Sequence, residues 1–354
     1  MTVSLRVLIR VDASPAIGLG HAMRCLALIE VLRSGGHVVH VCTAALPERL
    51  ADAMRATGAT LSQIAAHPGD DADASATSAR ATSRECDWVI ADGYGFGVEW
   101  QARVRASGAR LAMLDDEARA PRWDADLLLN QNLGVPATAY AASAPDALLL
   151  RGSRYVLLRT AFKAWSGFTR AVPSQAHHLL LTVGGADPEN LTARLIPGLA
   201  ECDALAVRVL VGAANPHRAA IDAAVAATAV AAAVGGATFT VLEHVDDMAE
   251  QMAWADLAIT AGGSTLWELA FMQVPSLVLV LADNQRGGAL ACEEAGMAFV
   301  LGDGATVNPL DVGHAVRALA GNAAACAAMA AAGGRLVDGE GAHRVVQALV
   351  AHAR

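Results

Sequence analysis

The sequence predicts an α/β protein with two doubly wound parallel sheets, one in each half of the chain. Its 354 residues are enough for about two domains of ordinary size. Short, uninterrupted apolar runs alternate with helical stretches, a pattern typical of parallel strands that are covered on both faces. The alternation stops at the segment 166–176, which contains Gly, Pro and Ser, and then restarts. A single (β/α)₈ barrel of this length is the alternative.

The apolar runs place the individual strands. In the first half they predict strands at Leu5–Val11, Val38–Cys42, Trp88–Ala91, Leu111–Leu114 and Ala125–Leu129. Helical patterns lie between them, at Ala22–Arg33, Leu46–Ala56 and Val98–Ala106. The polar segment Pro68–Arg84 predicts a weak surface helix to which we assign no function. In the second half, strands are predicted at Leu179–Val183, Val207–Val211, Phe239–Leu242, Leu257–Thr260 and Ser276–Leu281.

We therefore expect one domain over 1–165 and a second over 177–354, facing each other across a cleft. The final helix of the second domain would be able to pack back on the first. Open α/β sheets bind ligands beyond the carboxyl ends of their strands, so the functional motifs are sought there.

Composition excludes several classes of protein. The chain is 54% hydrophobic and carries a net charge of −9, which disfavours nucleic acid as the main partner. It has no apolar run of about 18 residues, so no membrane span is predicted. The N-terminus goes straight into a strand pattern without the features of a signal peptide, which favours a cytoplasmic location. The six cysteines are scattered, without a CxxC pair, and are expected to be free thiols.

The first motif joins the first strand to the first helix through Gly18, Gly20 and His21. Such a junction is a natural site for an anion or a nucleotide. Met23 stands where the dinucleotide fingerprint needs its third glycine, so no nicotinamide or flavin cofactor is expected. A helix N-terminus disfavours imidazolium, and a neutral His21 that faces a cleft would be a competent general base. Alternatively, His21 caps or packs the helix.

Four other residues of the first half are candidates. Asp12 would orient His21 or contact a substrate hydroxyl, unless it only forms an Asx turn. Arg10 and Arg24 would bind substrate or be solvated surface charges. Tyr94, between glycines at a strand end, would point into the cleft or cover the sheet edge. The acidic run 115–117 is better explained by helix capping than by a metal site.

In the second half, two strands end in glycine pairs. Gly184 and Gly185 precede Asp187 and Pro188, where Asp187 is expected to cap a helix that has Pro188 in its first turn. Gly262 and Gly263 precede the second helix start.

At that second start, the N–H groups of Ser264 and Thr265 would receive a pyrophosphate. Glu268 lies one turn further on and would accept hydrogen bonds from ribose hydroxyls, or form a capping box with Ser264 or Thr265. Asn284 and Gln285 follow the next strand, where their amides would reach a sugar or form a polar turn.

Together these motifs resemble the hydrolases of the pseudaminic acid pathway, which release UDP from UDP-2,4-diacetamido-2,4,6-trideoxy-β-L-altropyranose. The resemblance covers about residues 5–300, in order and with similar spacing, through the segments 12–24, 92–95, 114–117, 129–132, 183–187, 263–268 and 284–285. That family is similar to inverting glycosyltransferases of the GT-B fold. The resemblance implies two Rossmann-like domains, with the nucleotide held by the C-terminal one.

The resemblance also implies roles. His21 matches the base that activates water, and Tyr94 and Asn284 match residues at the sugar end of the cleft. With Asp12, these make up the expected catalytic group. The expected substrate-binding residues are Arg10, Gly18, Gly20, Arg24, Gly184, Gly185, Gly263, Ser264, Thr265, Glu268 and Gln285. Neither a cofactor nor a metal is implied, and a monomer is favoured.

The sequence departs from the family at two positions. Gly93 stands where the family often has His, and Ala186 where it often has Ser or Thr, which leaves the identity of the sugar open. Two other functions also stay open. One is a GT-B glycosyltransferase that uses a UDP-sugar donor and a sugar or lipid acceptor, and the other is a binding protein without turnover.

Overall fold

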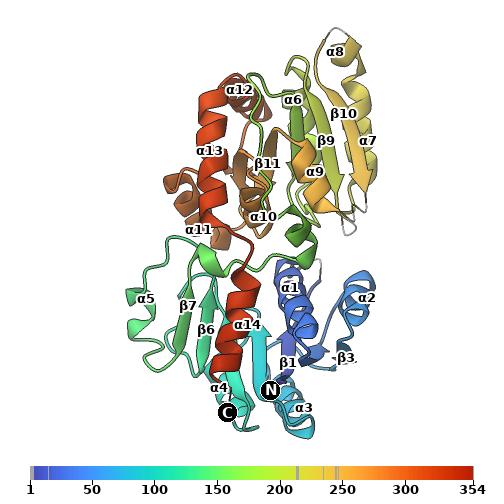
Figure 1. Ribbon diagram of the computed structural model, residues 1–354. Helices are drawn as coiled ribbons and strands as arrows, with labels where there is room; N and C mark the ends of the chain where they lie inside the picture. The colour runs from blue at the N-terminus through green and yellow to red at the C-terminus, as the bar shows by residue number, and fades with distance from the viewer. Residues whose placement is uncertain are drawn as a thin grey trace. The chain divides into compact units, whose positions relative to one another are not determined.

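The computed structural model describes residues 4–14, 16–212, 215–233, 235–243, 245 and 247–353. The chain forms two compact units. The first contains the residues up to Lys163 together with those from Gly339 onward, and the second contains Ala164–Asp338. Each unit is an α/β layer structure around one parallel sheet (Figure 1). The two doubly wound sheets predicted from the sequence are confirmed.

The first unit contains a seven-stranded sheet with the order β3-β2-β1-β4-β5-β6-β7. Its strands are β1 (Arg6–Val11), β2 (Val38–Thr43), β3 (Thr60–Gln63), β4 (Trp88–Asp92), β5 (Arg110–Leu114), β6 (Leu127–Asn130) and β7 (Leu148–Arg151). Every pair of neighbours is parallel. The helices are α1 (Gly20–Ser34), α2 (Glu48–Ala56), α3 (Asp71–Ser83), α4 (Val98–Arg105), α5 (Thr138–Ala141) and α14 (Gly341–Ala351), with short 3-10 turns at Ser153–Tyr155 and Thr160–Trp165.

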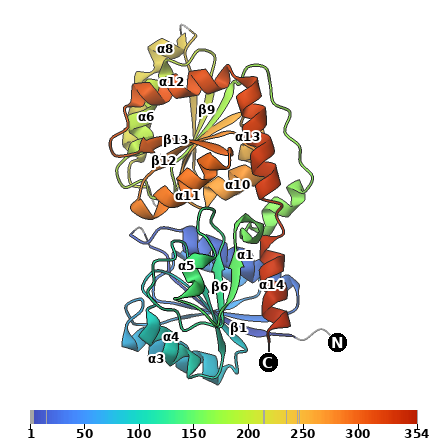
Figure 2. The same ribbon diagram turned by 90° about the vertical axis from the view of Figure 1, so that its left-hand side faces the viewer.

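The first sheet is buried on both faces, as its continuous apolar strands predict. Along β1, Val7 and Ile9 pack on one face with residues of α1 and α14, whereas Leu8 packs on the other with residues of α3 and α4. This follows from the alternation of side chains along a strand. Figure 2 shows α1 and α14 on one side of this sheet, and α3 and α4 on the other.

The second unit contains a six-stranded parallel sheet with the order β10-β9-β8-β11-β12-β13. Its strands are β8 (His178–Thr182), β9 (Ala206–Val211), β10 (Thr238–Glu243), β11 (Leu257–Ala261), β12 (Ser276–Val280) and β13 (Ala298–Asp303). Its helices are α6 (Leu191–Ala200), α7 (Arg218–Ala227), α8 (Ala229–Ala233), α9 (Met248–Trp254), α10 (Thr265–Phe271), α11 (Asp283–Glu294), α12 (Pro309–Ala320) and α13 (Ala323–Leu336).

The segment 166–176, expected to be a linker, is bound to the second unit. The Arg170 guanidinium donates to the backbone carbonyls of Met252, Ala255 and Met272. The side chain of Gln273 donates to the carbonyl of Phe168, at 2.8 Å. The boundary therefore lies before this segment, and α14 belongs to the first unit rather than to the second.

Within the described residues, no single helix is long and apolar enough to cross a membrane. One pair, 309–320 and 323–351, meets the criteria of length and composition only when joined across a bend of 91°.

Candidate functional site

The strand order of the first unit places its candidate site between β1 and β4. From β1 the chain builds the sheet outward to β2 and β3, and from β4 it builds the other way to β5, β6 and β7. Neighbouring strands whose connections diverge form a topological switch point, where open α/β sheets bind ligands. His21 is the second residue of the helix that follows β1, and Asp92 is the last residue of β4.

His21 and Asp92 are joined directly, with 2.7 Å between Nδ1 of His21 and Oδ1 of Asp92. Burial raises the pKa of the Asp92 carboxyl, but the charges of Arg24 and His21 and their hydrogen bonds hold this pKa well below its usual range. An ionised carboxylate can only accept hydrogen bonds, so we assign the proton of this contact to Nδ1. In the neutral ring, Nε2 then carries the lone pair that a general base needs.

Arg24 lies one turn after His21 and fixes the other side of this pair. Its Nε and Nη2 donate to Oδ2 and Oδ1 of Asp92, both at 2.6 Å. Its Nη1 and Nη2 also donate to Oδ1 and Oδ2 of Asp116, at 2.7 and 3.1 Å. The buried guanidinium is thus held between two carboxylates. Arg24 is thus not the solvated surface charge considered for it. Its geometry is that of a side chain that positions Asp92, and its contact with substrate stays a prediction.

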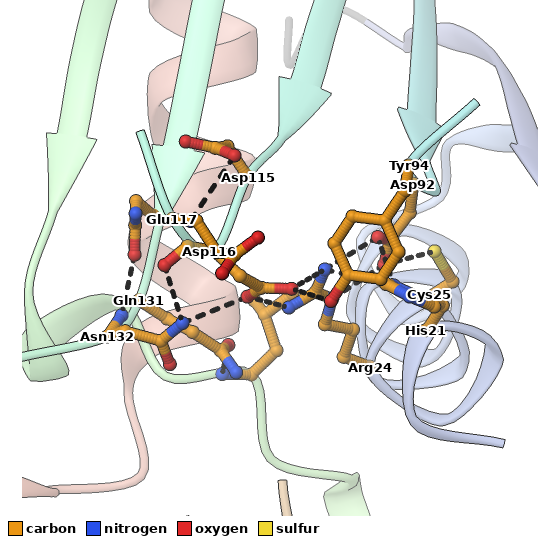
Figure 3. Close-up of polar contacts among 12 residues, drawn as sticks. His21, Arg24, Cys25, Asp92, Tyr94, Asp115, Asp116, Glu117, Gln131 and Asn132 are labelled. Atoms are coloured by element: carbon orange, nitrogen blue, oxygen red, sulfur yellow. Dashed lines mark hydrogen bonds and ion pairs between the residues drawn. The ribbon is translucent and has the colours of Figure 1, made fainter. Parts of the chain in front are cut away.

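Tyr94 is 62% exposed, and two contacts place it beside His21. Its hydroxyl donates to Oδ2 of Asp116 at 3.1 Å, and its ring meets the imidazole edge-on, with 4.9 Å between centroids. Figure 3 shows His21, Arg24, Asp92 and Tyr94 gathered on one side of Asp116 and Asn132 on the other. Its exposure is compatible with the expectation that Tyr94 points into a cleft, which stays a prediction.

Asp12 and Arg10 bind other partners, which hold the loops and helices around the sheet. Oδ1 of Asp12 accepts from Thr43 Oγ1 and from the N–H groups of Ala44 and Ala45, so it holds the loop after β2. Arg10 is completely buried and makes a bidentate contact with Asp73 at 2.9 and 2.7 Å. Arg10 is therefore not the solvated surface charge considered for it, and its contact with substrate stays a prediction. Asp92, rather than Asp12, orients His21.

The glycines before His21 shape the start of α1. Gly18 has a φ of +84°, a left-handed conformation that favours glycine, and its N–H donates to the carbonyl of Ser14 at 2.8 Å. Gly20 is the first residue of the helix, and Leu19 before it provides no side-chain cap. The side chain of Leu19 therefore caps none of the N–H groups in the first turn of α1, the turn that follows β1.

In the second unit, Gly184, which follows β8, has a φ of +106°. Gly185 packs closely on Gly212, since a Cβ on Gly212 would lie 2.3 Å from the carbonyl oxygen of Gly185. The carboxylate of Asp187 accepts from the N–H groups of Leu191 and Thr192, at 2.8 and 2.9 Å. Asp187 therefore caps the helix as expected. The helix itself begins later than expected, at Leu191, so Pro188 precedes it.

The turn after β11 also depends on close packing. A Cβ on Gly262 would lie 3.2 Å from Cβ of Gln285, whereas one on Gly263 would meet nothing within 4 Å. Ser264 precedes α10 without making a side-chain cap, and both Thr265 and Glu268 are partly exposed. The backbone at Gly263 is thus open to the approach of a ligand.

Asn284 and Gln285 lie in the first turn of α11, which begins at Asp283. Asn284 is exposed, whereas Oε1 of Gln285 accepts from the N–H of Leu281 at 3.0 Å. Gln285 thus stabilises the strand-to-helix turn, which is the alternative considered for it. Within the part of the chain that the structure describes, no group of three or more His, Cys, Asp or Glu side chains is placed to hold a metal ion.

Sequence comparisons agree with this architecture. Residues 178–344 match the model of the glycosyltransferase family 28 C-terminal domain. The chain is 23% identical over 272 residues to the spore coat polysaccharide biosynthesis protein SpsG of Bacillus subtilis, with coverage of 75% of this chain and 77% of SpsG. It is 22% identical over 287 residues to an uncharacterized protein of Methanocaldococcus jannaschii, covering 80% of this chain but only 57% of that protein.

Solved structures extend the similarity to the whole chain. Acinetobacter baumannii MurG superposes with a TM-score of 0.68 at 18% identity, covering 98% of this chain and 99% of MurG. The glycosyltransferase of kitacinnamycin superposes with a TM-score of 0.67 at 16% identity, covering 99% of this chain and all of that one. The fold is that of the GT-B glycosyltransferases. Staphylococcus aureus MnaA, solved with UDP, is also similar, with a TM-score of 0.65 at 13% identity over 97% of this chain and 95% of MnaA.

Proposed function

We propose that this GT-B protein is an enzyme that breaks the bond between the anomeric carbon and the diphosphate of a UDP-sugar, with His21 as the general base. The observation that carries this proposal is the 2.7 Å contact that fixes His21 on the ionised Asp92 at the switch point of the first sheet. In such a contact Nε2 is available to take a proton.

The reaction is a single displacement. Nε2 of His21 removes a proton from an attacking O–H group, and the oxygen forms a bond to the anomeric carbon. The bond from that carbon to the diphosphate oxygen breaks, its electron pair leaves with UDP, and the configuration inverts. The glycine turns after β8 and β11, with Ser264, Thr265 and Glu268, would bind UDP, where backbone N–H groups would stabilise the leaving diphosphate. Asn284, at the start of α11, would reach the sugar.

The attacking group distinguishes two candidate functions. The comparisons favour a glycosyltransferase with a sugar or lipid acceptor, because family 28 and the kitacinnamycin protein are described as glycosyltransferases. The fold alone does not decide between transfer and another reaction, since a putative UDP-N-acetylglucosamine 2-epimerase from Listeria monocytogenes and the UDP-bound MnaA have similar structures. The sequence resemblance described above favours water, and therefore hydrolysis of a UDP-diacetamido sugar by a monomeric cytoplasmic enzyme.

Product analysis by NMR tests the proposal and separates the candidates. The protein would be incubated with UDP-sugars that differ at C2 and C4, with and without sugar and lipid acceptors, in water enriched in ¹⁸O. Release of UDP only with an acceptor would establish transfer. Release without an acceptor, with inverted free sugar that carries ¹⁸O at C1, would establish hydrolysis. Absence of UDP release from every donor in both conditions would refute the proposed chemistry.

A further inference from the structure

Asp116 connects three segments of the candidate site. It lies in the loop after β5, and its carboxylate accepts hydrogen bonds from Arg24 on α1, from Tyr94 after β4 and from Asn132 after β6. Oδ1 receives Nη1 of Arg24 at 2.7 Å and Nδ2 of Asn132 at 3.0 Å, and Oδ2 receives the Tyr94 hydroxyl at 3.1 Å. Burial raises the pKa of the Asp116 carboxyl, but the charge and hydrogen bonds of Arg24 outweigh this and lower it.

The ionised state of Asp116 fixes the direction of these bonds. A carboxylate has no proton to give, so every one of these partners must be a donor. The same Arg24 that contacts Asp116 also makes the bidentate contact with Asp92, and Asp92 holds His21. One guanidinium therefore transmits the position of Asp116 to the imidazole through two charge-assisted contacts, which are short and directional.

Tyr94 depends on Asp116 for a different reason. It lies between Gly93 and Gly95 in a loop, and its side chain is 62% exposed, so its ring is not part of a packed core. The hydrogen bond to Asp116 restricts the hydroxyl end of this ring, whose edge then meets His21. Asp116 thus constrains the two side chains, His21 and Tyr94, that are closest to the proposed reaction.

We propose that Asp116 is a positioning residue that fixes the Tyr94 side chain and the His21–Asp92 pair relative to each other. Asp116 acts through Arg24 and Tyr94, and the inference rests on the proposed role of His21 as a base. It also defines the substrate group that Tyr94 meets. Because the hydroxyl proton of Tyr94 is directed to Asp116, its oxygen is an acceptor toward a ligand. The matching group on the sugar is an N–H or O–H donor.

The test begins with Asp116→Asn, which keeps the shape of the side chain but replaces one acceptor oxygen by a donor N–H₂. The amide cannot accept from Arg24 on one edge and from Tyr94 on the other. We expect kcat to fall by about 100-fold, the size typical of misplaced catalytic groups, with KM and the Kd for UDP changed by less than about threefold. Glu117→Gln is the matched control, because it removes the same charge one residue away from Asp116. Glu117 pairs with the exposed Arg119.

A double-mutant cycle with Tyr94→Phe separates positioning from a general structural effect. If Asp116 acts partly through the Tyr94 hydroxyl, Asp116→Asn will reduce kcat less in the Tyr94→Phe background than in the wild type. Full additivity, or turnover of Asp116→Asn within about twofold of the wild type, would overturn the inference.

A spectroscopic measurement keeps this result distinct from failure of the proposed function. The Hδ1 proton of His21 is assigned by ¹⁵N-edited NMR as the imidazole signal lost in His21→Phe. We expect Asp116→Asn to broaden it through faster exchange with water, whereas Glu117→Gln leaves it sharp. An unchanged signal in Asp116→Asn would refute the inference even if the enzyme releases UDP. A changed signal in a protein that releases no UDP would refute the proposed reaction alone.

Discussion

The two units share a parallel sheet but differ in what they place at the carboxyl ends of their strands. In the first, buried and half-buried polar side chains are joined by hydrogen bonds: His21, Arg24, Asp92 and Asp116 form one connected network. In the second, the corresponding turns consist of glycines and of short polar side chains such as Ser264 and Thr265. The first arrangement fixes side chains that move protons, and the second lets a ligand approach the backbone.

This contrast has a physical basis. A general base needs a fixed orientation and a defined tautomer, and charged neighbours supply both. A diphosphate is already charged, and backbone N–H groups at a helix start bind it without lysine or arginine. We therefore expect substitutions in the first unit to change turnover and those in the second to change nucleotide affinity.

The largest effect is expected from His21→Phe. Removal of the base should lower kcat by roughly 10²- to 10⁴-fold, the usual contribution of general base catalysis. The Kd for UDP, measured by calorimetry, should not change, because the proposed UDP contacts lie in the second unit. His314→Phe, at an exposed position on α12, is the control. Loss of UDP binding in His21→Phe would contradict the assignment of turnover to the first unit and of nucleotide affinity to the second.

The second prediction concerns the stability of the first unit. Burial lowers the pKa of the Arg10 guanidinium, but hydrogen bonds and opposite charge from Asp73 and Asp12 raise it above its usual value. Arg10→Met leaves the fully buried Asp73 unpaired and should cost about 3–5 kcal/mol in the free energy of unfolding. Urea unfolding measures this cost.

Arg55→Met is the matched control for Arg10→Met. Arg55 also pairs with two carboxylates, those of Glu48 and Asp52, but on the exposed surface of α2. Its loss should change the unfolding free energy far less than the loss of Arg10, because an exposed ion pair contributes little to stability. Equal costs for the two variants would contradict the role of burial in this prediction.

A smaller effect is expected in the second unit from Glu268→Gln. If the Glu268 carboxylate accepts a hydrogen bond from the ribose, the Kd of the Glu268→Gln variant for UDP should be about tenfold higher than that of the wild type, as expected for the loss of one charged hydrogen bond. The wild type should discriminate against 2′-deoxy-UDP or 3′-deoxy-UDP, and the variant should not. Glu250→Gln, on the exposed first turn of α9, provides the control. Undiminished discrimination in Glu268→Gln would assign the ribose to other residues.

The smallest effect is a dependence of stability on acid. The pKa values of the Asp92 and Asp116 carboxyls are lowered in the folded state, from an ordinary value of 3.8. Their stabilisation is thus fully present above about pH 4 and is lost as the pH falls below it. Urea midpoints from pH 7 to pH 3 should show this loss in the first unit. Asp92→Asn should flatten the curve below pH 4, and an unchanged slope would contradict the prediction.

The sequence was sufficient for the fold because most strands are continuous apolar runs. It missed β3, whose four residues, Thr60–Gln63, are polar and lie at a sheet edge. It also missed β7 and β13, and it left without a role the segment that becomes α3 and supplies Asp73 to Arg10. A buried partner of a charge is visible only once the chain is folded.

The candidate site was predictable only in part, because local sequence patterns identify single residues but not their partners in the fold. His21 and Tyr94 were found because glycines flank them at strand ends. The partner of His21 was sought nearby, at Asp12, whereas Asp92 lies 71 residues away. The signal that would have found Asp92 is the strand order, since β4 lies next to β1 in the sheet. Asp116 was noticed only as part of the acidic run 115–117, which was interpreted as a helix cap because an acid after a strand is typical of one.

The return of α14 to the first unit has a consequence for the order of folding. The indole N–H of the buried Trp88 donates to the carbonyl of Leu349 at 3.1 Å, across 261 residues of chain. Leu349 and Val345 fill the same core as β1 and α1. During synthesis, the part of the first unit's core that α14 fills therefore stays incomplete until the entire second unit has been made. The second unit is thus able to finish folding before the first, although its synthesis begins later.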